Sequence, residues 1–368
     1  MIIGVLKEPS SETRVSLVPE TVATFTKKGL QVWIESGAGA NAFCSDEVYL
    51  QSGALISERK VILEGADVLL GIHVPEDLSS IPAGKVMIGV YMPLFNRASV
   101  DMVQRAGLTV FSLDMLPRTT RAQSMDVLSS QANIAGYKAV LMAANAFPRY
   151  FPMFMTAAGS IPPAKVLILG AGVAGLQAIA TARRLGAVVE VFDTRPAVKE
   201  EVMSLGAKFV EVEGAADASK AGGYAVDQSE DYKRKQQDRI SESVRKSDII
   251  ITTAQIPGKK APVLITEDML HQMRSGSVII DLAAATGGNT PFTKNNETVH
   301  INGVAIIGNS NLQATLPFDA SKLYAKNVFN FLQLVISKEG ALNLNFDDDL
   351  VKGSCITQDG KVVHERLL

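Results

Sequence analysis

The chain has 368 residues and a formal net charge of −2, with 47% hydrophobic and 20% charged residues. This composition is typical of a globular protein long enough for two domains, and the nearly balanced charge gives no reason to expect nucleic acid as a partner. No apolar run approaches the roughly eighteen residues of a membrane-spanning helix, and Met1 leads directly into the strand-like IIGVL, so we expect neither membrane insertion nor a signal peptide.

Strand-like and helical segments alternate in the first 120 residues. A helix is expected from about Pro19 to Lys28, where Gly29 stops it, and the strand-like segments are IIGVL, QVWIES, ADVLLGIH, KVMIGVY and TVFSLDM. This alternation predicts an α/β domain, although it contains no G-x-G-x-x-G motif.

Two long helical segments, 124–147 and 319–337, are expected to connect this domain with the rest of the chain. The tail that follows, SCITQDGKVVHERLL, has a turn signal at its Asp-Gly pair and would pack back onto the first domain. We therefore expect a discontinuous first domain, made of residues 1–125 and 325–368.

The remaining segment, 140–320, carries a longer series of apolar strands. They are expected at 166–169, 188–193, 208–212, 249–254, 277–282 and 303–308. Six such strands suffice for a complete doubly wound sheet, and the loop AATGGN follows the fifth strand at the end where such sheets bind ligands.

The stretch KVLILGAGVAGLQAIATARRLGAVVEVFD is the most informative part of this second segment. Its first strand runs into Gly170, Gly172 and Gly175 in G-x-G-x-x-G spacing, and a helix, a second strand and Asp193 follow. The first glycine permits a tight turn, the second leaves room for a pyrophosphate, and the third allows close helix–strand packing. Free N–H groups at the helix start favour a diphosphate, and Asp193 can accept the hydroxyls of an adenosine ribose. The sequence thus predicts a dinucleotide site in an α/β fold of two Rossmann-like, doubly wound domains separated by a cleft.

Asp193 also influences which dinucleotide is expected to bind. A carboxylate at Asp193 would repel a 2′-phosphate, which favours NAD(H) over NADP(H). Arg195 weakens this preference, because an arginine near the ribose can accommodate such a phosphate.

A polar, charged segment over 213–246 interrupts the strands. It is interpreted either as an exposed loop leading into a solvated helix or as a lid that closes on the cofactor. In the second interpretation Gly222-Gly223 is the hinge and Tyr224 the aromatic residue that closes.

A second motif, PRTTRAQSMDVLSS, begins at residue 117. Its polar side chains are Arg118, Gln123, Asp126 and Ser129, and the last two share a helix face because they are three residues apart. Such a face could bind the amide of a nicotinamide and fix the orientation of the ring. A capped helix start with an incidental arginine explains the same pattern equally well.

Cysteine and histidine give no sign of a metal site. Cys44 and Cys355 have neither metal-ligand spacing nor a disulfide pattern, which suits a reducing compartment. The four histidines form no ligand cluster and are expected to be surface or structural residues: His73, His271, His300 and His364.

In these motifs the chain resembles the soluble NAD(H)-binding component of the proton-translocating nicotinamide nucleotide transhydrogenases. The similarity covers essentially the whole chain and rests on KEPSSETRVSLVPETV, PRTTRAQSMDVLSSQANIAGYKAV, the glycine-rich segment, GGYA, TTAQIPGKKAP and VIIDLAAATGGN. The resemblance implies that the family's nicotinamide loop maps onto the predicted catalytic residues Arg118, Gln123, Asp126 and Ser129. The cofactor-binding residues are predicted to be Gly170, Gly172, Val173, Ala174, Gly175, Asp193, Thr194, Arg195, Tyr224 and Ala254.

The resemblance also implies a reaction and partners. NADH would pass hydride directly to NADP⁺ bound on a partner domain, as in Re/Si-specific transhydrogenases, and a separate membrane domain would translocate protons. Hydride transfer makes no O–H or N–H bond at the reacting carbons, so orientation and exclusion of water would suffice. A homodimer is expected, peripheral to the cytoplasmic side of a bacterial inner membrane, or to the matrix side in mitochondria.

Two other functions remain open. Alanine dehydrogenase shares the two-domain fold and an N-terminal E-x-R-V motif, but it needs a lysine, a histidine and an aspartate for substrate binding and proton handling. Local alignment places at these three positions His73, Pro93 and Ala285. Only Arg14 is then left to hold a carboxylate. The other possibility is an NAD(H)-responsive binding module without chemistry.

Overall fold

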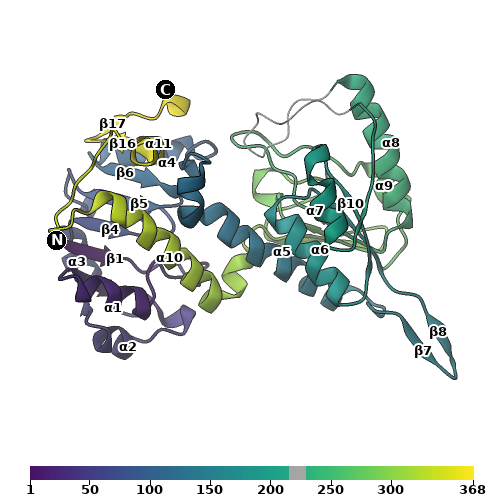
Figure 1. The fold of residues 1–368 in the computed structure, drawn as a ribbon, viewed down its shortest axis with the longest axis horizontal. Coiled ribbons are helices and arrows are strands. Elements are labelled where there is room, and N and C mark those ends of the chain that lie inside the picture. The colour runs from purple at the N-terminus through teal and green to yellow at the C-terminus, as the bar shows by residue number, and fades with distance from the viewer. Residues whose placement is uncertain (215–228) are drawn as a thin grey trace. The chain divides into compact units, whose positions relative to one another are not determined.

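The structure is a computed structural model that describes residues 1–214 and 229–368 (Figure 1). The chain divides into two compact α/β units, unit 1 with residues 1–131 and 314–368, and unit 2 with residues 132–313. The α/β class and a discontinuous first domain are therefore confirmed.

Unit 1 contains an eight-stranded sheet in the order β17-β16-β6-β5-β4-β1-β2-β3. The first six strands of the chain are parallel, whereas β16 runs antiparallel to β6 and β17 antiparallel to β16. The C-terminal tail thus returns to the first unit, as predicted. The strands are β1 (Ile2–Val5), β2 (Gln31–Glu35), β3 (Leu55–Ser57), β4 (Val68–Leu70), β5 (Val86–Gly89), β6 (Thr109–Ser112), β16 (Cys355–Gln358) and β17 (Lys361–Val362).

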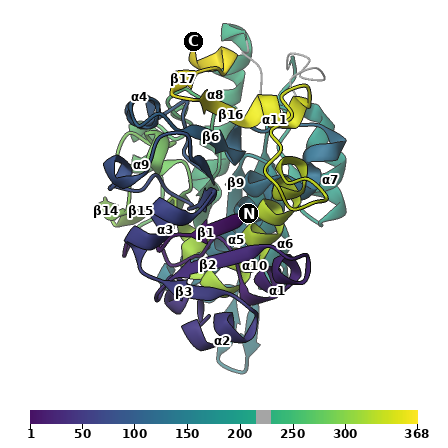
Figure 2. The same ribbon diagram turned by 90° about the vertical axis from the view of Figure 1, so that its left-hand side faces the viewer.

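Helices cover both faces of this sheet. They are α1 (Pro19–Lys27), α2 (Asp46–Gln51), α3 (Arg59–Gly65), α4 (Arg97–Arg105), α10 (Pro317–Val335) and α11 (Asp349–Ser354). Ile3 belongs to a core with Phe25 of α1 and Phe331 of α10, while Leu69 belongs to a separate core with Ile62 of α3. Figure 2 shows α1 and α10 on one side of β1 and β2, and α3 on the other. Burial on both faces explains why β1, β4 and β5 carry no polar side chains, whereas β2 alternates buried residues with less buried ones.

Unit 2 contains a seven-stranded sheet in the order β11-β10-β9-β12-β13-β15-β14. It is parallel except for β14, which pairs antiparallel with β15 at one edge. The strands are β9 (Lys165–Leu169), β10 (Val188–Phe192), β11 (Lys208–Phe209), β12 (Ile249–Thr252), β13 (Val278–Asp281), β14 (Glu297–Ile301) and β15 (Val304–Gly308). The helices are α5 (Val127–Ala146), which begins in unit 1, α6 (Val173–Arg184), α7 (Lys199–Ser204), α8 (Glu230–Lys246) and α9 (Glu267–His271).

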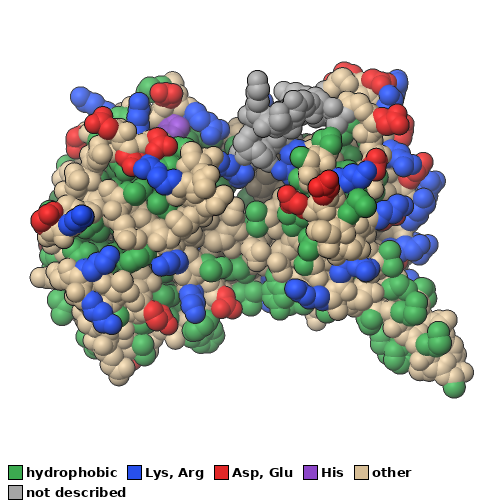
Figure 3. Space-filling view, in the orientation of Figure 1, with side chains coloured by type: hydrophobic (Ala, Val, Ile, Leu, Met, Phe, Trp, Pro, Cys, Tyr) green, Lys and Arg blue, Asp and Glu red, His purple; other side chains and the backbone are tan. Residues whose placement is uncertain are grey.

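Three strands of unit 2 were absent from the sequence prediction. One is β14, whose side chains are mostly exposed at the sheet edge and therefore lack an apolar run. The others form a hairpin, β7 (Phe154–Thr156) and β8 (Gly159–Ile161), that projects from unit 2 with almost all of its residues exposed (Figures 1 and 3).

Two predicted helices have shifted starts. The helix expected at 124–147 begins at Val127, because Thr120–Met125 form a 3₁₀ turn. The helix expected at 319–337 begins at Pro317, whose fixed φ and missing N–H suit the first turn of a helix.

The charged segment ends in the expected solvated helix, α8, while most of the loop before it lies outside the described residues, so the choice between its two interpretations stays open. Ser229 caps α8 by accepting from the amide of Tyr232, and an exposed ion pair joins Lys235 to Asp231. The hinge and aromatic residue of the lid interpretation, Gly222-Gly223 and Tyr224, lie outside the described residues. In the described part of the chain, no helix is both long and apolar enough to cross a membrane.

Candidate functional site

The glycine-rich loop of unit 2 joins β9 to α6. Gly170 has φ +107°, and a Cβ there would lie 2.4 Å from Thr253 Oγ1. A Cβ on Gly175 would lie 1.9 Å from the carbonyl oxygen of Gly170. Around Gly172, which precedes α6, a Cβ would meet no atom within 4 Å. Two glycines are therefore required by the fold, whereas the third leaves open space at the helix start, where a diphosphate would lie.

A fourth glycine, Gly136, is also required by the fold in this region, but it was not identified from the sequence. Gly136 on α5 packs so closely on α6 that a Cβ would lie 2.1 Å from the carbonyl oxygen of Ala174. The only signal for it is the run of small residues in ANIAGYKAV.

Asp193 follows β10 and is almost fully buried. One carboxylate oxygen, Oδ2, accepts from the amide of Ala171 in the glycine-rich loop at 2.7 Å. The other, Oδ1, accepts from the backbone amide of Arg195 and from its Nε, both at 2.8 Å. The guanidinium also donates through Nη2 to Oδ2 at 2.7 Å. Hydrogen bonding to Asp193 raises the pKa of Arg195.

Two more loops follow β12 and β13 at the carboxyl ends of the strands, and the first of them contacts the glycine-rich loop. After β12, Thr253 Oγ1 donates to the carbonyl oxygen of Gly170 at 3.1 Å. After β13, the fully buried Asn289 accepts from the amide of Ala254 at 3.2 Å and donates to the carbonyl oxygens of Ala254 and Pro262 at 2.9 and 2.8 Å. Asp281 holds Asn289 by accepting from its backbone amide at 2.6 Å. Asn289 thus fixes Ala254, and sequence reading did not find it because its three contacts are to backbone atoms.

We expect Asn289→Ala to lower the free energy of unfolding by about 1–3 kcal/mol, because it leaves buried backbone groups of the 254–262 loop without partners. NADH affinity should fall several-fold as Ala254 loses its fixed position. Denaturant unfolding and NADH titration measure the two effects, with Asn295→Ala, at an exposed residue, as the control. An unchanged NADH affinity in Asn289→Ala would contradict the prediction that Ala254 belongs to a cofactor site.

The predicted catalytic residues lie in unit 1. Asp126 caps α5, because its Oδ1 accepts from the amide of Ser129 at 2.9 Å and its Oδ2 from the Ser129 hydroxyl at 2.6 Å. Arg118 and Gln123 are exposed just before this helix start. The structure therefore brings Asp126 and Ser129 together in a helix cap, while the nicotinamide role of all four residues stays a prediction.

The other predicted cofactor residues are placed as follows. Val173 is exposed at the start of α6, Ala174 is half-buried behind it, and Thr194 is half-buried next to Asp193. Tyr224 is outside the described residues.

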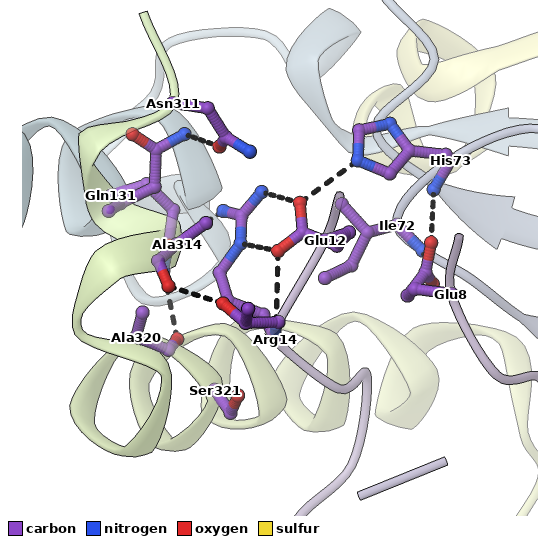
Figure 4. Close-up of polar contacts among 12 residues, drawn as sticks. Glu8, Glu12, Arg14, Ile72, His73, Gln131, Asn311, Ala314, Ala320 and Ser321 are labelled. Carbon is purple, nitrogen blue, oxygen red and sulfur yellow. Dashed lines mark hydrogen bonds and ion pairs between the residues drawn. The ribbon is translucent and has the colours of Figure 1, made fainter. Parts of the chain in front are cut away.

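Unit 1 has a charged cluster of its own at the carboxyl ends of β1 and β4 (Figure 4). Arg14 donates to both carboxylate oxygens of Glu12, from Nε at 2.8 Å and from Nη2 at 2.7 Å. Its Nη1 donates to Gln131 Oε1 at 2.9 Å, and His73 Nε2 lies 2.9 Å from Glu12 Oε2. Glu8 accepts from the amides of Ile72 and His73. Burial raises the pKa of Glu8, and the amide hydrogen bonds only partly oppose this.

This cluster bears on the alanine dehydrogenase alternative. Arg14 is buried and already bound by a carboxylate of the chain itself, which leaves it poorly suited to hold the carboxylate of a keto acid. His73 takes part in the same network as a structural partner of Glu12, in line with the role expected for the histidines.

Comparisons with known proteins cover the whole chain. Residues 4–135 match the model for the N-terminal domain of the alanine dehydrogenase/PNT family, and residues 139–365 match the model for its C-terminal domain. An alpha-subunit component of the NAD(P) transhydrogenase of Rhodospirillum rubrum is 44% identical over 100% of this chain and 99% of its own length. The corresponding protein of Rickettsia prowazekii is 42% identical over 99% and 96%.

Solved structures give the same result. The transhydrogenase of Sinorhizobium meliloti superposes with a TM-score of 0.90 at 43% identity, over 99% of this chain and 100% of that one. An L-alanine dehydrogenase superposes with a TM-score of 0.83 over 100% and 98%, but at 24% identity this likeness concerns the fold alone.

Proposed function

The chain belongs to the alanine dehydrogenase/PNT family and is a component of a transhydrogenase, and from this premise we propose that it is the component that binds NAD(H) and exchanges hydride with NADP(H) held on a partner domain. The observation that carries the proposal is the open helix start at Gly172 beside the Ala171–Asp193 hydrogen bond. The helix start would offer a diphosphate the N–H groups in the first turn of α6. The hydrogen bond from Ala171 holds Asp193, the proposed ribose-binding acid, beside the glycine-rich loop.

The bound NADH supplies the hydride, and the chain supplies its placement. We assign Arg118 and Gln123 to the nicotinamide amide and ribose, and Asp126 with Ser129 to the fixed helix start that positions them. Such placement of donor and acceptor carbons can contribute many orders of magnitude to the rate without any acid or base. Proton translocation belongs, in this proposal, to a membrane domain, and the chain works at the cytoplasmic side of a bacterial inner membrane or the matrix side of a mitochondrial one.

We further propose that the component is a homodimer. The β7–β8 hairpin and the residues before it expose Met153, Phe154 and Met155, the last to 74% of its surface. Tyr150, itself exposed, stacks on Phe154 with ring centroids 4.9 Å apart, which adds a stacked aromatic pair to this exposed apolar surface. A second copy of the chain would remove this surface from water.

Stopped-flow hydride transfer tests the proposal. The chain, loaded with NADH, is mixed with a reducible NADP⁺ analogue with and without an NADP(H)-binding domain of a transhydrogenase. Fast transfer that requires both proteins is expected. NADH oxidation on addition of pyruvate and ammonia alone would favour the dehydrogenase alternative, and NADH binding without any transfer would favour a binding module.

Gln123→Ala and Arg118→Ala should each slow this transfer by roughly 100-fold while changing NADH affinity far less, because misplacing the nicotinamide costs rate rather than binding. Thr120→Ala, at an exposed residue in the 3₁₀ turn that carries Gln123, is the matched control. Equal losses of rate and affinity would mean that the two side chains are ordinary binding contacts.

A further inference from the structure

The carboxylate of Asp193 has no acceptor position to spare. A carboxylate offers about four lone-pair sites. In this structure Oδ1 takes two donors, the backbone amide and the Nε of Arg195, and Oδ2 takes two more, the amide of Ala171 and the Nη2 of Arg195. All four distances lie between 2.7 and 2.8 Å, so each is a full hydrogen bond.

These four donors differ in how easily they can leave. The Ala171 amide belongs to the backbone of the glycine-rich loop, and the Arg195 amide to the turn after β10. Both positions are fixed by the fold. The guanidinium sits on a flexible side chain that is 18% exposed. Ribose hydroxyls can therefore hydrogen-bond to the Asp193 carboxylate only if the Arg195 side chain moves away from it.

The ion pair also changes the charge that a dinucleotide meets. A bare Asp193 would present one negative charge, which repels a 2′-phosphate, whereas the pair with Arg195 is neutral overall. Repulsion by Asp193 alone thus does not account for selection of NAD(H) over NADP(H). The fork-shaped, two-point contact with Asp193 keeps the guanidinium turned toward the acid instead of a 2′-phosphate.

We propose that Arg195 is a specificity-determining residue that competes with the adenosine ribose for Asp193 and would bind the 2′-phosphate of NADP(H) once Asp193 no longer holds it. This inference rests on the proposed dinucleotide site. It gives Arg195 two opposite effects: the residue weakens NADH binding in the wild-type protein, and it supplies latent affinity for a 2′-phosphate.

A comparison of four proteins tests the inference: the wild type, Arg195→Gln, Asp193→Asn, and the double variant. NADH and NADPH dissociation constants are measured by calorimetric titration at two salt concentrations, with thermal unfolding as the check on folding. Arg195→Gln should bind NADH several-fold more tightly than the wild type. Asp193→Asn should lose at least about tenfold in NADH affinity and gain about tenfold in NADPH affinity, and the gain should shrink at high salt.

The double variant is decisive. If Arg195 is the group that receives the 2′-phosphate, the gain in NADPH affinity disappears when both residues are changed. A gain that persists in the double variant, or a loss of NADH affinity in a folded Arg195→Gln protein, would overturn the inference while leaving the proposed function in place. Should Arg195→Gln fail to fold, Arg195→Lys, which keeps the charge but not the fork, is expected to tighten NADH binding to a smaller extent. A wild-type protein that binds neither dinucleotide would overturn the proposed function and this inference together.

Discussion

Glu12→Gln is expected to lower the free energy of unfolding by about 3–5 kcal/mol, the usual cost of removing one partner from a buried ion pair. Glu12 is 2% and Arg14 5% exposed, so the guanidinium left behind could not recover its lost contacts from water. Denaturant unfolding at pH 7 measures the loss. Glu64→Gln, which breaks an exposed pair with Lys60 on α3, is the matched control and should change stability by less than about 1 kcal/mol.

The same pair predicts how stability depends on pH. Burial alone would raise the pKa of Glu12, but hydrogen bonds from Arg14 and His73 outweigh it and hold the pKa well below the usual 4.5. A carboxyl with a lowered pKa in the folded state stabilises the protein above its unfolded-state pKa, and this contribution is lost as the pH falls toward the folded-state value. The stability difference between wild type and Glu12→Gln should therefore shrink below about pH 4.5. A difference that stays constant down to pH 3 would contradict the assignment.

Gly175→Ala should abolish measurable NADH binding and lower the free energy of unfolding by about 1–3 kcal/mol or more, because the new Cβ would lie 1.9 Å from the Gly170 carbonyl oxygen. The Gly170 carbonyl cannot easily move away from this Cβ, since Gly170 is held at φ +107° and packs against Thr253. The strand, the turn and the helix start that form the dinucleotide site would be forced apart.

Gly172→Ala, in the same glycine-rich loop, is the informative counterpart. Its Cβ meets no atom of the protein within 4 Å and its φ of −77° suits alanine, so we expect no loss of stability. NADH affinity should nevertheless fall, because the methyl group would occupy the space proposed for the diphosphate. Thermal unfolding and NADH titration on both variants separate the two roles. A Gly172→Ala protein with normal NADH affinity would place the diphosphate elsewhere.

Local patterns were enough to predict most of the fold. Continuous apolar runs such as 166–169 indicate strands buried on both faces, and G-x-G-x-x-G spacing indicates a tight turn before a helix. The edge strand β14 and the β7–β8 hairpin were missed because their residues are mostly exposed and gain little from burial, so no apolar pattern marks them.

The side-chain contacts were less predictable than the strands. Arg14 binds Gln131, 117 residues away in the chain, and Asn289 binds the backbone at Ala254, 35 residues away. Neither contact leaves a periodic or short-range signature. The Asp126–Ser129 pair does have a local sequence pattern, but the same pattern is compatible with both a helix cap and a nicotinamide site. The cap is present, and only kinetics can assign the second role.

The split of unit 1 along the chain has a consequence for biosynthesis. Its sheet is incomplete until β16 pairs with β6, and its core lacks Phe331 and Leu332 until α10 has been made. Unit 2, by contrast, is complete at residue 313. On a ribosome that adds roughly 5–20 residues per second, the middle of the chain can therefore fold before the beginning, whose apolar strands must wait for the last segment to emerge.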